Sequence, residues 1–419
     1  MRNRILLAAV FLVLLLPQPA FAQEPWSGAV LQAEVDFGAS ITFIVRAKAP
    51  QPVAPVELLF QLEGERARNR VIVRAVSGAN VDAEWTWELD SGEIPPGRMI
   101  TYWWRAKTQD GRTLETEKSQ VEYADTRFTW ERREEGNIRL FWYGGSRADA
   151  DKMMQAAQEA LGRLEAGTGV GVDTPVRVFL YRSKSDMSAA ISSRSESYDA
   201  ATITLGMAMG GDTIVILSTD AGAEDTIAHE LSHIVIGKFT DNPLGGLPTW
   251  LDEGLAMYAE GDLRGDNKRD LEQAIRDNEL ISVRSLSGYP GQAGLVDLFY
   301  GECHSVVKFL IDTYGSGKMD RLLQTFRRGV YQEDALREVY GFGLDGLEDE
   351  WRAAIGAAPR PTPAPTSQAG DGTPQAGEPT RSPTRTPTPE KPNVEIPFCS
   401  SEGLILVMVG VLVWRRTAA

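Results

Sequence analysis

Residues 28 to 124 consist of short runs in which apolar and polar positions alternate, such as SITFIVRAKA, PVELLFQLEG and MITYWWRAKTQ. Turn-forming stretches such as APQPVAP and IPPG separate the runs. Alternation with a period of two places every second side chain on one face of a β-strand, so each run predicts a strand. Seven such runs at regular spacing, with no helical period among them, predict an all-β domain over residues 23–125.

The expected architecture of this first domain is a two-sheet sandwich of the immunoglobulin or fibronectin type, a fold of about 100 residues built from about seven short strands. Trp85, Trp87, Trp103 and Trp104 all lie within the predicted strands. Aromatic side chains in strands usually contribute buried apolar area. This favours core packing for the four tryptophans over a ligand-binding aromatic patch.

The pattern changes near Asp125, where a predicted hairpin is followed by segments with a helical period and by two short apolar strands. A small sheet followed by a helical half predicts an α+β domain over residues 126–358. The expected elements are a hairpin at 128–145, a helix from Ala148 to Ala166, strands at Pro175–Tyr181 and Asp212–Ser218, and helices after Ala221.

Both ends of the chain have compositions that bear on location. Arg2 and Arg4 precede an apolar run and a small-residue A-x-A site, which predicts a signal peptide over residues 1–22. Residues 359–392 are dominated by Pro, Thr, Ser, Gly and Ala and predict an extended, disordered linker. Residues 393–419 hold an apolar segment closed by two arginines, which is either a short membrane anchor or a C-terminal sorting signal. We expect an exported protein, held by this tail at the outer face of the membrane or in the cell envelope.

The formal net charge of -15 argues against a nucleic-acid partner, because phosphate binding requires clustered Lys and Arg. The chain has two cysteines, Cys303 and Cys399, which lie in regions of very different composition. A structural disulfide between them is therefore not expected. Folding has to depend on ordinary apolar cores.

His229 and His233 are two of only three histidines in the chain, and they flank Glu230 in the segment HELSH. On a helix this spacing puts both imidazoles on one face, one turn apart, opposite the apolar stripe that begins with Ile227 and Leu231. Two imidazoles in this arrangement can bind one Zn²⁺, and Glu230 can reach a water molecule on the metal. The segment therefore predicts the metal-binding helix of a zinc hydrolase.

Glu253 follows His233 with 19 residues between them, in the segment PTWLDEGLAMYAE. A zinc hydrolase needs a third protein ligand and one open position for water. Leu251 and Leu255 can pack while Glu253 points toward the first helix, and a carboxylate is seldom placed in such an apolar helix without a partner. We interpret Glu253 as the third ligand rather than as a capping or surface glutamate.

The segments HELSH and WLDEG together resemble the gluzincin metallopeptidases, and in particular the peptidase MA-like family, whose second helix has the pattern P-x-W-L-x-E-G-x-A. The resemblance is strong from Thr226 to Glu260 and weaker over residues 127 to 355. It implies a thermolysin-like fold with His229, His233 and Glu253 as zinc ligands and Glu230 as the general base. The implied substrate is an extracellular peptide or protein. The chain has no GAMEN-type sequence of the aminopeptidases, so the choice between endopeptidase and exopeptidase stays open.

Other candidates for the site keep two interpretations each. Tyr300 and His304, four residues apart, are either donors to the oxyanion of the reaction or packed residues of a helix. Asp225 and Asp252 either orient the ligand imidazoles or are solvated charges. The strand at Asp212–Ser218 is either the edge along which an extended substrate binds or an ordinary edge strand.

Two hypotheses on function follow from different parts of the chain. The first is a secreted, surface-tethered zinc metallopeptidase. The alternative is a catalytically inert surface protein in which the β-sandwich serves binding or adhesion. All four positions of the zinc motif are intact, which favours the enzyme.

Overall fold

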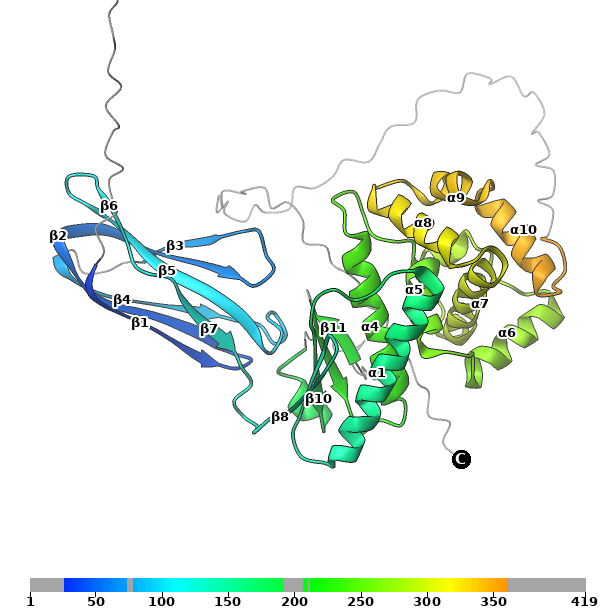
Figure 1. Ribbon diagram of the computed structural model, residues 1–419, viewed down its shortest axis with the longest axis horizontal. Coiled ribbons are helices and arrows are strands. Elements are labelled where there is room, and N and C mark those ends of the chain that lie inside the picture. The colour runs from blue at the N-terminus through cyan, green and yellow to red at the C-terminus, as the bar shows by residue number, and fades with distance from the viewer. Residues whose placement is uncertain (1–25, 74–77, 192–205, 210–211, 361–419) are drawn as a thin grey trace, which may run out of the picture. The chain divides into compact units, whose positions relative to one another are not determined.

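The computed structural model describes residues 26–73, 78–191, 206–209 and 212–360 (Figure 1). The chain divides into two compact units between Arg127 and Phe128. The expected signal peptide, the linker beyond Arg360 and the apolar tail lie outside the described residues. Among the helices of the described ranges, none is both long and apolar enough to cross a membrane.

The first unit is built from strands in its described residues. β2 is a single strand of 23 residues that takes up two of the expected strands, with the segment APQPVAP continuing the strand instead of forming a turn. Its first half pairs with β1 and β4, and its second half pairs with β3 and β5. The strands are β1 Ser27–Asp36, β2 Ser40–Leu62, β3 Asn69–Val73, β4 Gly78–Glu88, β5 Arg98–Thr108, β6 Thr113–Glu115 and β7 Ser119–Tyr123.

The two halves of β2 pack against each other. The ring centroids of Phe43, in the first half, and Phe60, in the second half, are 5.7 Å apart. Trp103 and Trp104 are buried, which confirms core packing for these two, while Trp85 and Trp87 are half-buried and pack against Phe60. The all-β character of this unit is confirmed, and its immunoglobulin-like topology stays a prediction.

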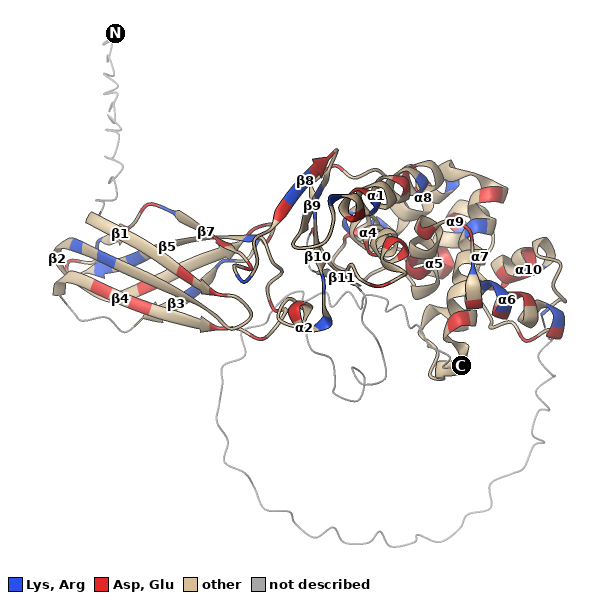
Figure 2. Cartoon of the chain, turned by 90° about the horizontal axis from the view of Figure 1, so that it is seen from below, with Lys and Arg blue, Asp and Glu red and all other residues tan. Residues whose placement is uncertain are grey.

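The second unit begins with a five-stranded sheet in the order β11-β12-β10-β9-β8. β8 is an edge strand with the sequence ERREE, and Figure 2 shows charged residues along it. Charges on an edge disfavour pairing with a second chain. The bounds are β8 Glu131–Glu135, β9 Ile138–Trp142, β10 Val176–Tyr181, β11 Gly206–Met209 and β12 Thr213–Leu217.

One expectation about this sheet is wrong. The segment Asp212–Ser218 was expected at an edge, but its strand β12 lies inside the sheet, parallel to β10 and antiparallel to β11. All five residues of β12 are buried, and four of them are apolar, as is typical of a strand that is covered on both faces. The edge on this side of the described sheet is β11.

In the described residues, two helices lie between strands of the sheet and the others follow it, and the expected α+β class is confirmed. The expected helix at Ala148–Ala166 is α1, which begins at a capping box of Ser146 and Asp149 and ends before Gly169, whose φ of 73° suits glycine. The helices are α1 Arg147–Thr168, α2 Lys184–Met187, α4 Ala223–Thr240, α5 Thr249–Glu260, α6 Gly265–Asp277, α7 Val296–Tyr314, α8 Ser316–Arg327, α9 Gln332–Tyr340 and α10 Leu344–Ala354, with 3₁₀ turns η1 Ser285–Ser287 and η2 Ala293–Leu295.

α4 lies between two apolar cores. Ile227 and Leu231 belong to the core that joins α4 to the sheet and α1. Val235 and Ile236 belong to the core of the helical half, together with residues of α5 and α7. Because α4 is covered on both sides, the polar face of HELSH is enclosed as well, and the described polar residues of this face are buried.

α5 and α7 approach each other closely at Gly254, the residue after Glu253. A Cβ atom on Gly254 would clash with the carbonyl oxygen of Cys303 and the side chain of Val307, both on α7. A main-chain atom cannot move aside as a flexible side chain can. The close contact between these two helices therefore requires glycine at this position.

We expect Gly254→Ala to destabilise the protein by about 2 kcal/mol or more, because overpacking of a close contact usually costs 1–3 kcal/mol. Gly162→Ala is the matched control. Gly162 lies in α1, is exposed, and has open space where a Cβ would be, so this change should stabilise by up to about 1 kcal/mol. Urea denaturation followed by far-UV circular dichroism measures both. Equal effects of the two substitutions would contradict the close contact.

Glu302 on α7 is a fully buried carboxyl group. Its Oε1 accepts a hydrogen bond from the main-chain N–H of Ile281 at 2.9 Å. Burial raises the pKa of Glu302 to about 8, although this hydrogen bond and the charge of Arg352 act in the opposite direction. The folded state therefore binds a proton on Glu302 more tightly than the unfolded chain does. Between the pKa of Glu302 in the unfolded chain and its pKa in the folded protein, a rise in pH therefore lowers the free energy of unfolding.

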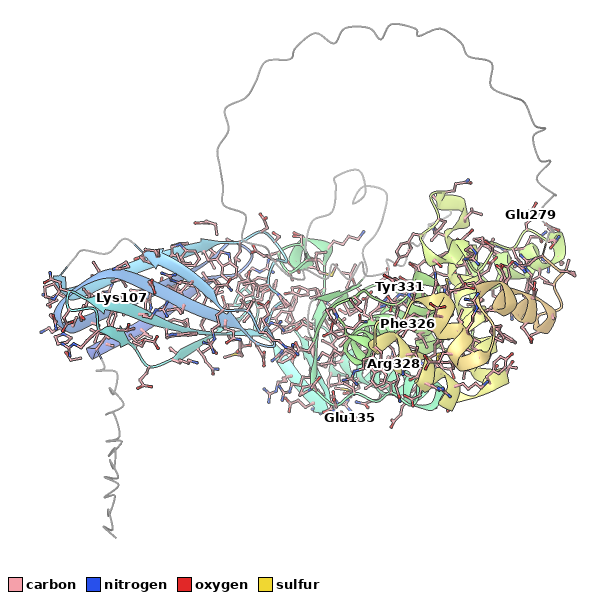
Figure 3. All side chains as sticks on the ribbon, turned by 90° about the horizontal axis from the view of Figure 1, so that it is seen from above. Lys107, Glu135, Glu279, Phe326, Arg328 and Tyr331 are labelled. Atoms are coloured by element: carbon pink, nitrogen blue, oxygen red, sulfur yellow. The ribbon has the colours of Figure 1, made fainter. Side chains whose placement is uncertain are left out.

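Glu302→Gln should remove this pH dependence, because an amide stays neutral. We expect the melting temperature of the variant, relative to the parent, to rise between pH 5 and pH 8, about the interval between the two pKa values of the carboxyl group. Glu279→Gln, an exposed glutamate near the same segment (Figure 3), is the control and should show no such trend. A variant that follows the parent at every pH would refute the prediction.

Candidate metal centre

The side chains of His229, His233 and Glu253 converge in the interior of the second unit. Glu253 Oε2 lies 3.3 Å from His229 Nε2 and 3.9 Å from His233 Nε2. One ligand atom from each residue can be chosen such that all three lie within 4.8 Å of one another. The side chains are at most 4% exposed. α4 supplies both histidines and α5 supplies the glutamate, as expected from their spacing.

The donor atoms of this cluster fit a metal ion. Of the buried polar atoms in the described residues, His229 Nε2, His233 Nε2 and Glu253 Oε2 are among the few without a hydrogen-bond partner. A buried polar atom without a partner is costly, and here three of them face one another. Two imidazole nitrogens and one carboxylate oxygen are the donor set of a catalytic zinc site, which leaves a fourth position open.

A second layer of carboxylates surrounds the imidazoles. Glu260 Oε1 lies 2.7 Å from His229 Nδ1, and Asp252 Oδ1 lies 3.3 Å from His233 Nδ1. A carboxylate on Nδ1 fixes the ring so that Nε2 faces the metal. Asp252 lies at ion-pair distance from His233 Nδ1, which agrees with the first of its two interpretations. Asp225 instead pairs with Arg264 at the surface.

Sequence reasoning missed Glu260. It follows Glu253 by seven residues in the same helix, and residues seven apart share one helix face. This periodicity is the signal that would have identified it as a second inward-facing carboxylate of α5.

The electrostatics of the cluster favour positive charge. Burial alone would lower the pKa of both histidines, but Glu253 and Glu260 raise the pKa of His229 well above its usual value, and Asp252 and Glu253 raise that of His233 to about 9. Burial also acts against the charge of Glu253, yet the two imidazoles and the hydrogen bond from Tyr289 keep the pKa of this carboxyl low. The same negative surroundings would hold a divalent cation, and a metal bound at Nε2 displaces the proton there.

Glu230 and Tyr300 are the other groups placed near the cluster. Glu230 is buried on α4 beside His229. Tyr300 is buried on α7, with its ring centroid 6.2 Å from that of His229. Burial and the charges of Glu253 and Glu230 raise the pKa of Tyr300, so its hydroxyl keeps its proton and can donate a hydrogen bond.

His304 has a different environment from the one expected of an oxyanion donor. Its Nε2 lies 3.1 Å from the carbonyl oxygen of Gly261, just after the end of α5. Burial lowers the pKa of His304, and the charges that act on it are those of Lys308, Asp262 and Asp312 rather than those of the metal cluster. The contact with Gly261 is that of a packed helix residue, the second of the two interpretations given above.

Tyr289 is a member of the site that the sequence did not indicate. It lies in the segment between η1 and η2, and its hydroxyl donates a hydrogen bond to Glu253 Oε1. A tyrosine in a stretch rich in Gly and Pro, LSGYPGQAG, has no periodicity that would relate it to a distant helix. The contact between Tyr289 and Glu253 is therefore visible only in the three-dimensional structure.

A family model described as the Peptidase MA superfamily matches residues 156–357. This part of the chain belongs to the Peptidase MA superfamily. The match includes α4, α5 and α7 and therefore every residue of the metal cluster. The family expected from HELSH and WLDEG is confirmed.

The chain also matches solved structures, at low sequence identity. The M1 zinc metallopeptidase from Deinococcus radiodurans is 13% identical, with 82% of this chain and 94% of that chain covered and a TM-score of 0.31. A variant of that enzyme with a bound Tyr-Ser-Ala substrate is 14% identical over 80% and 94% of the two chains, with a TM-score of 0.34. BhCBM56 is 12% identical over 24% of this chain and 96% of its own, with a TM-score of 0.19. Similarities of this size carry no functional conclusion. No curated protein matched the chain.

Glu260→Gln should weaken zinc binding by about 10- to 100-fold, the range usual for partners of metal-bound histidines. The reason is that an amide no longer holds the Nδ1 proton of His229 by a charged contact. Asp225→Asn is the control, because Asp225 forms its ion pair with Arg264 at the surface. Competition with a chromogenic chelator measures both affinities, and parental affinity in Glu260→Gln would contradict the assignment.

Proposed function

We propose that the protein is a gluzincin-type zinc peptidase that hydrolyses peptide bonds in polypeptides outside the cell. The observation that carries this proposal is the convergence of His229 Nε2, His233 Nε2 and Glu253 Oε2 in a buried site. Glu230 directly follows His229 in α4, and residues 156–357 belong to a peptidase superfamily.

Zinc at this site would polarise the scissile carbonyl and lower the pKa of a water molecule to about 7. His229, His233 and Glu253 would hold the ion, and Asp252 and Glu260 keep the two imidazole rings in orientation. Glu230 accepts a proton from the attacking water and transfers it to the leaving amine. Because this carboxylate is buried, bulk water does not compete for the proton.

Tyr300 supplies the second stabilising group of the proposed reaction. Its hydroxyl keeps its proton and can donate to the carbonyl oxygen as that atom gains negative charge. A donor held in a buried position needs little reorganisation when the charge develops. His304, which contacts Gly261, has no part in this step.

The edge of the sheet offers a place for an extended substrate. β11 pairs with β12 on one side and ends the described sheet on the other. An edge strand of this kind can bind a peptide through main-chain hydrogen bonds, which recognise the backbone rather than particular side chains. We assign this role to β11 in place of β12.

The proposed location outside the cell is based on the two ends of the sequence. Residues 1–22 have the pattern of a signal peptide, and residues 393–419 that of an anchor or sorting signal. A linker at residues 359–392 would keep the peptidase domain away from the membrane. This arrangement suits soluble extracellular polypeptides as substrates.

Glu230→Gln tests the mechanism. The variant should retain zinc at parental affinity, because Glu230 is not a ligand, and should lose about 10²- to 10⁴-fold in kcat, the usual contribution of a general base. Glu224→Gln, an exposed position in the first turn of the same helix, is the control. Cleavage of a peptide library, followed by mass spectrometry, measures activity, and a Glu230→Gln protein as active as the parent would exclude the mechanism.

A further inference from the structure

The two oxygens of Glu253 have different partners. Oε2 faces the imidazole nitrogens, at 3.3 Å from His229 Nε2 and 3.9 Å from His233 Nε2. Oε1 accepts the hydrogen bond from Tyr289. The ring of Tyr289 packs against Phe299, with ring centroids 5.6 Å apart, and 42% of the residue is exposed. One side of Tyr289 thus faces the metal cluster while the other faces solvent.

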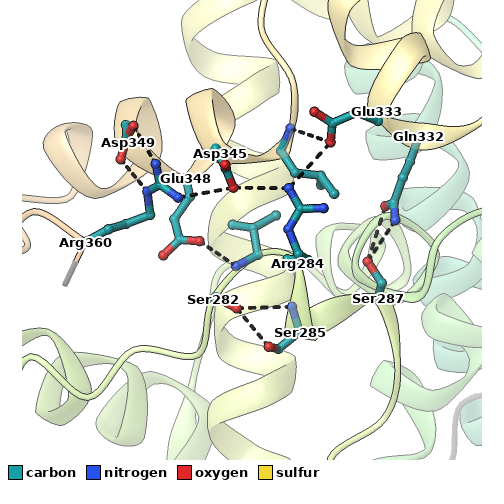
Figure 4. A network of polar contacts seen from close by, with 12 residues as sticks. Ser282, Arg284, Ser285, Ser287, Gln332, Glu333, Asp345, Glu348, Asp349 and Arg360 are labelled. Carbon is teal, nitrogen blue, oxygen red and sulfur yellow. Dashed lines mark hydrogen bonds and ion pairs between the residues drawn. The ribbon is translucent and has the colours of Figure 1, made fainter. Parts of the chain in front are cut away.

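The segment that carries Tyr289 is held at its start by hydrogen bonds to two buried carboxyl groups, those of Glu302 and Glu348. Glu302 Oε1 accepts the N–H of Ile281 at 2.9 Å, and Glu348 Oε2 accepts the N–H of Val283 at 3.1 Å. Arg352 Nε donates to Glu348 Oε1 at 2.9 Å, and Glu302, Glu348 and Arg352 are all buried. Figure 4 shows Glu348 in contact with this segment. The ion pair of Arg352 with Glu348 is a buried, charge-assisted hydrogen bond, one of the strong kind in proteins, so this part of the segment is fixed in place.

A second set of contacts ties the segment to α5 itself. Thr249 Oγ1 donates to the carbonyl oxygen of Ser287 at 3.0 Å. Gln332 donates from Nε2 to Ser287 Oγ at 3.1 Å and accepts the indole N–H of Trp250 at 3.1 Å, and the bond between Gln332 and Ser287 is drawn in Figure 4. Thr249 and Glu253 lie one turn apart on α5. Ser287 and Tyr289 therefore contact the same helix one turn apart.

We propose that Tyr289 is a positioning residue for the metal ligand Glu253. Its hydroxyl engages Oε1, which would leave Oε2 as the single oxygen of Glu253 for a bound zinc ion and the fourth position for water or substrate. This inference rests on the proposed zinc site and adds a residue that acts through the ligand. Without the hydroxyl, Oε1 is free to turn toward the metal and bind it as well, at the expense of the open position.

Tyr289→Phe removes the hydroxyl and keeps the ring that packs on Phe299. We expect the affinity for zinc to fall by about 10- to 100-fold, as for other residues that orient metal ligands. The melting temperature without metal should fall only slightly, because one hydrogen bond to Glu253 is lost. The rise in melting temperature on addition of zinc should become smaller, since that rise depends on affinity.

A spectroscopic readout separates positioning from simple packing. With Co²⁺ in place of zinc, the visible absorption reports the coordination geometry. Tyr289→Phe should have weaker and shifted bands, because a second oxygen of Glu253 raises the coordination number. Tyr331→Phe is the control, because Tyr331 is 81% exposed (Figure 3). It should match the parent in zinc affinity, melting temperature and Co²⁺ spectrum.

Three results would overturn the proposal. The first is parental zinc affinity together with a parental Co²⁺ spectrum in Tyr289→Phe. The second is an equal loss of melting temperature with and without zinc, which would make Tyr289 a packing residue. The third is a parent protein that binds no zinc, which would also remove the proposed function. A parent that binds zinc but cleaves no peptide would contradict the proposed function alone, and the effect of Tyr289→Phe on affinity would still support its positioning role.

Discussion

The burial of charged side chains between α4 and α5 is the constraint on which the second unit depends. His229, Glu230, His233 and Glu253 are all buried, and a charge taken out of water must be balanced by a partner or by a metal ion. Asp252 and Glu260 provide part of that balance on the Nδ1 side of the two rings. The Nε2 side has Glu253 Oε2 and no hydrogen bonds among the described residues. A divalent cation at this point would satisfy all three atoms at once, which is why the cluster is best explained as a binding site rather than as a structural ion pair.

The sequence was most informative where the chemistry is local. HELSH places two imidazoles and a carboxylate within one turn and a half of a single helix, and WLDEG places the third ligand in a helix rich in apolar residues. These patterns need no knowledge of the tertiary structure beyond the contact between two helices. Asp252 could also be proposed from the sequence, because it is adjacent to Glu253. The contact of Tyr289 with Glu253 could not be predicted, because Tyr289 lies in a segment whose path depends on buried contacts with Glu302 and Glu348.

The fold was likewise predictable where the sequence signal is local, and not where it depends on contacts between distant segments. The strands, the hairpin and the long helix α1 each have a strong period or a capping signal, and each is present near its expected position. β2 differs because a stretch rich in Pro and Ala continues the strand where a turn was expected. Its two halves pair with different partners, which only the whole sheet reveals. The place of β12 was misjudged for a related reason, since a short apolar run has the same appearance at an edge and in the interior, and the presence of β11 decides between them.

α5 connects the parts of the site because a helix of 12 residues supplies the ligand Glu253, both outer carboxylates and the contact with Ser287. Its distance from α7 is set by Gly254, which lies directly after the ligand and against the carbonyl oxygen of Cys303. Cys303 is in turn one helical turn from Tyr300 on α7. A side chain at position 254 would move α7, and with it Tyr300, away from the cluster. The separation between the metal ligands and the proposed oxyanion donor therefore depends on a residue that has no polar side chain and touches neither metal nor substrate.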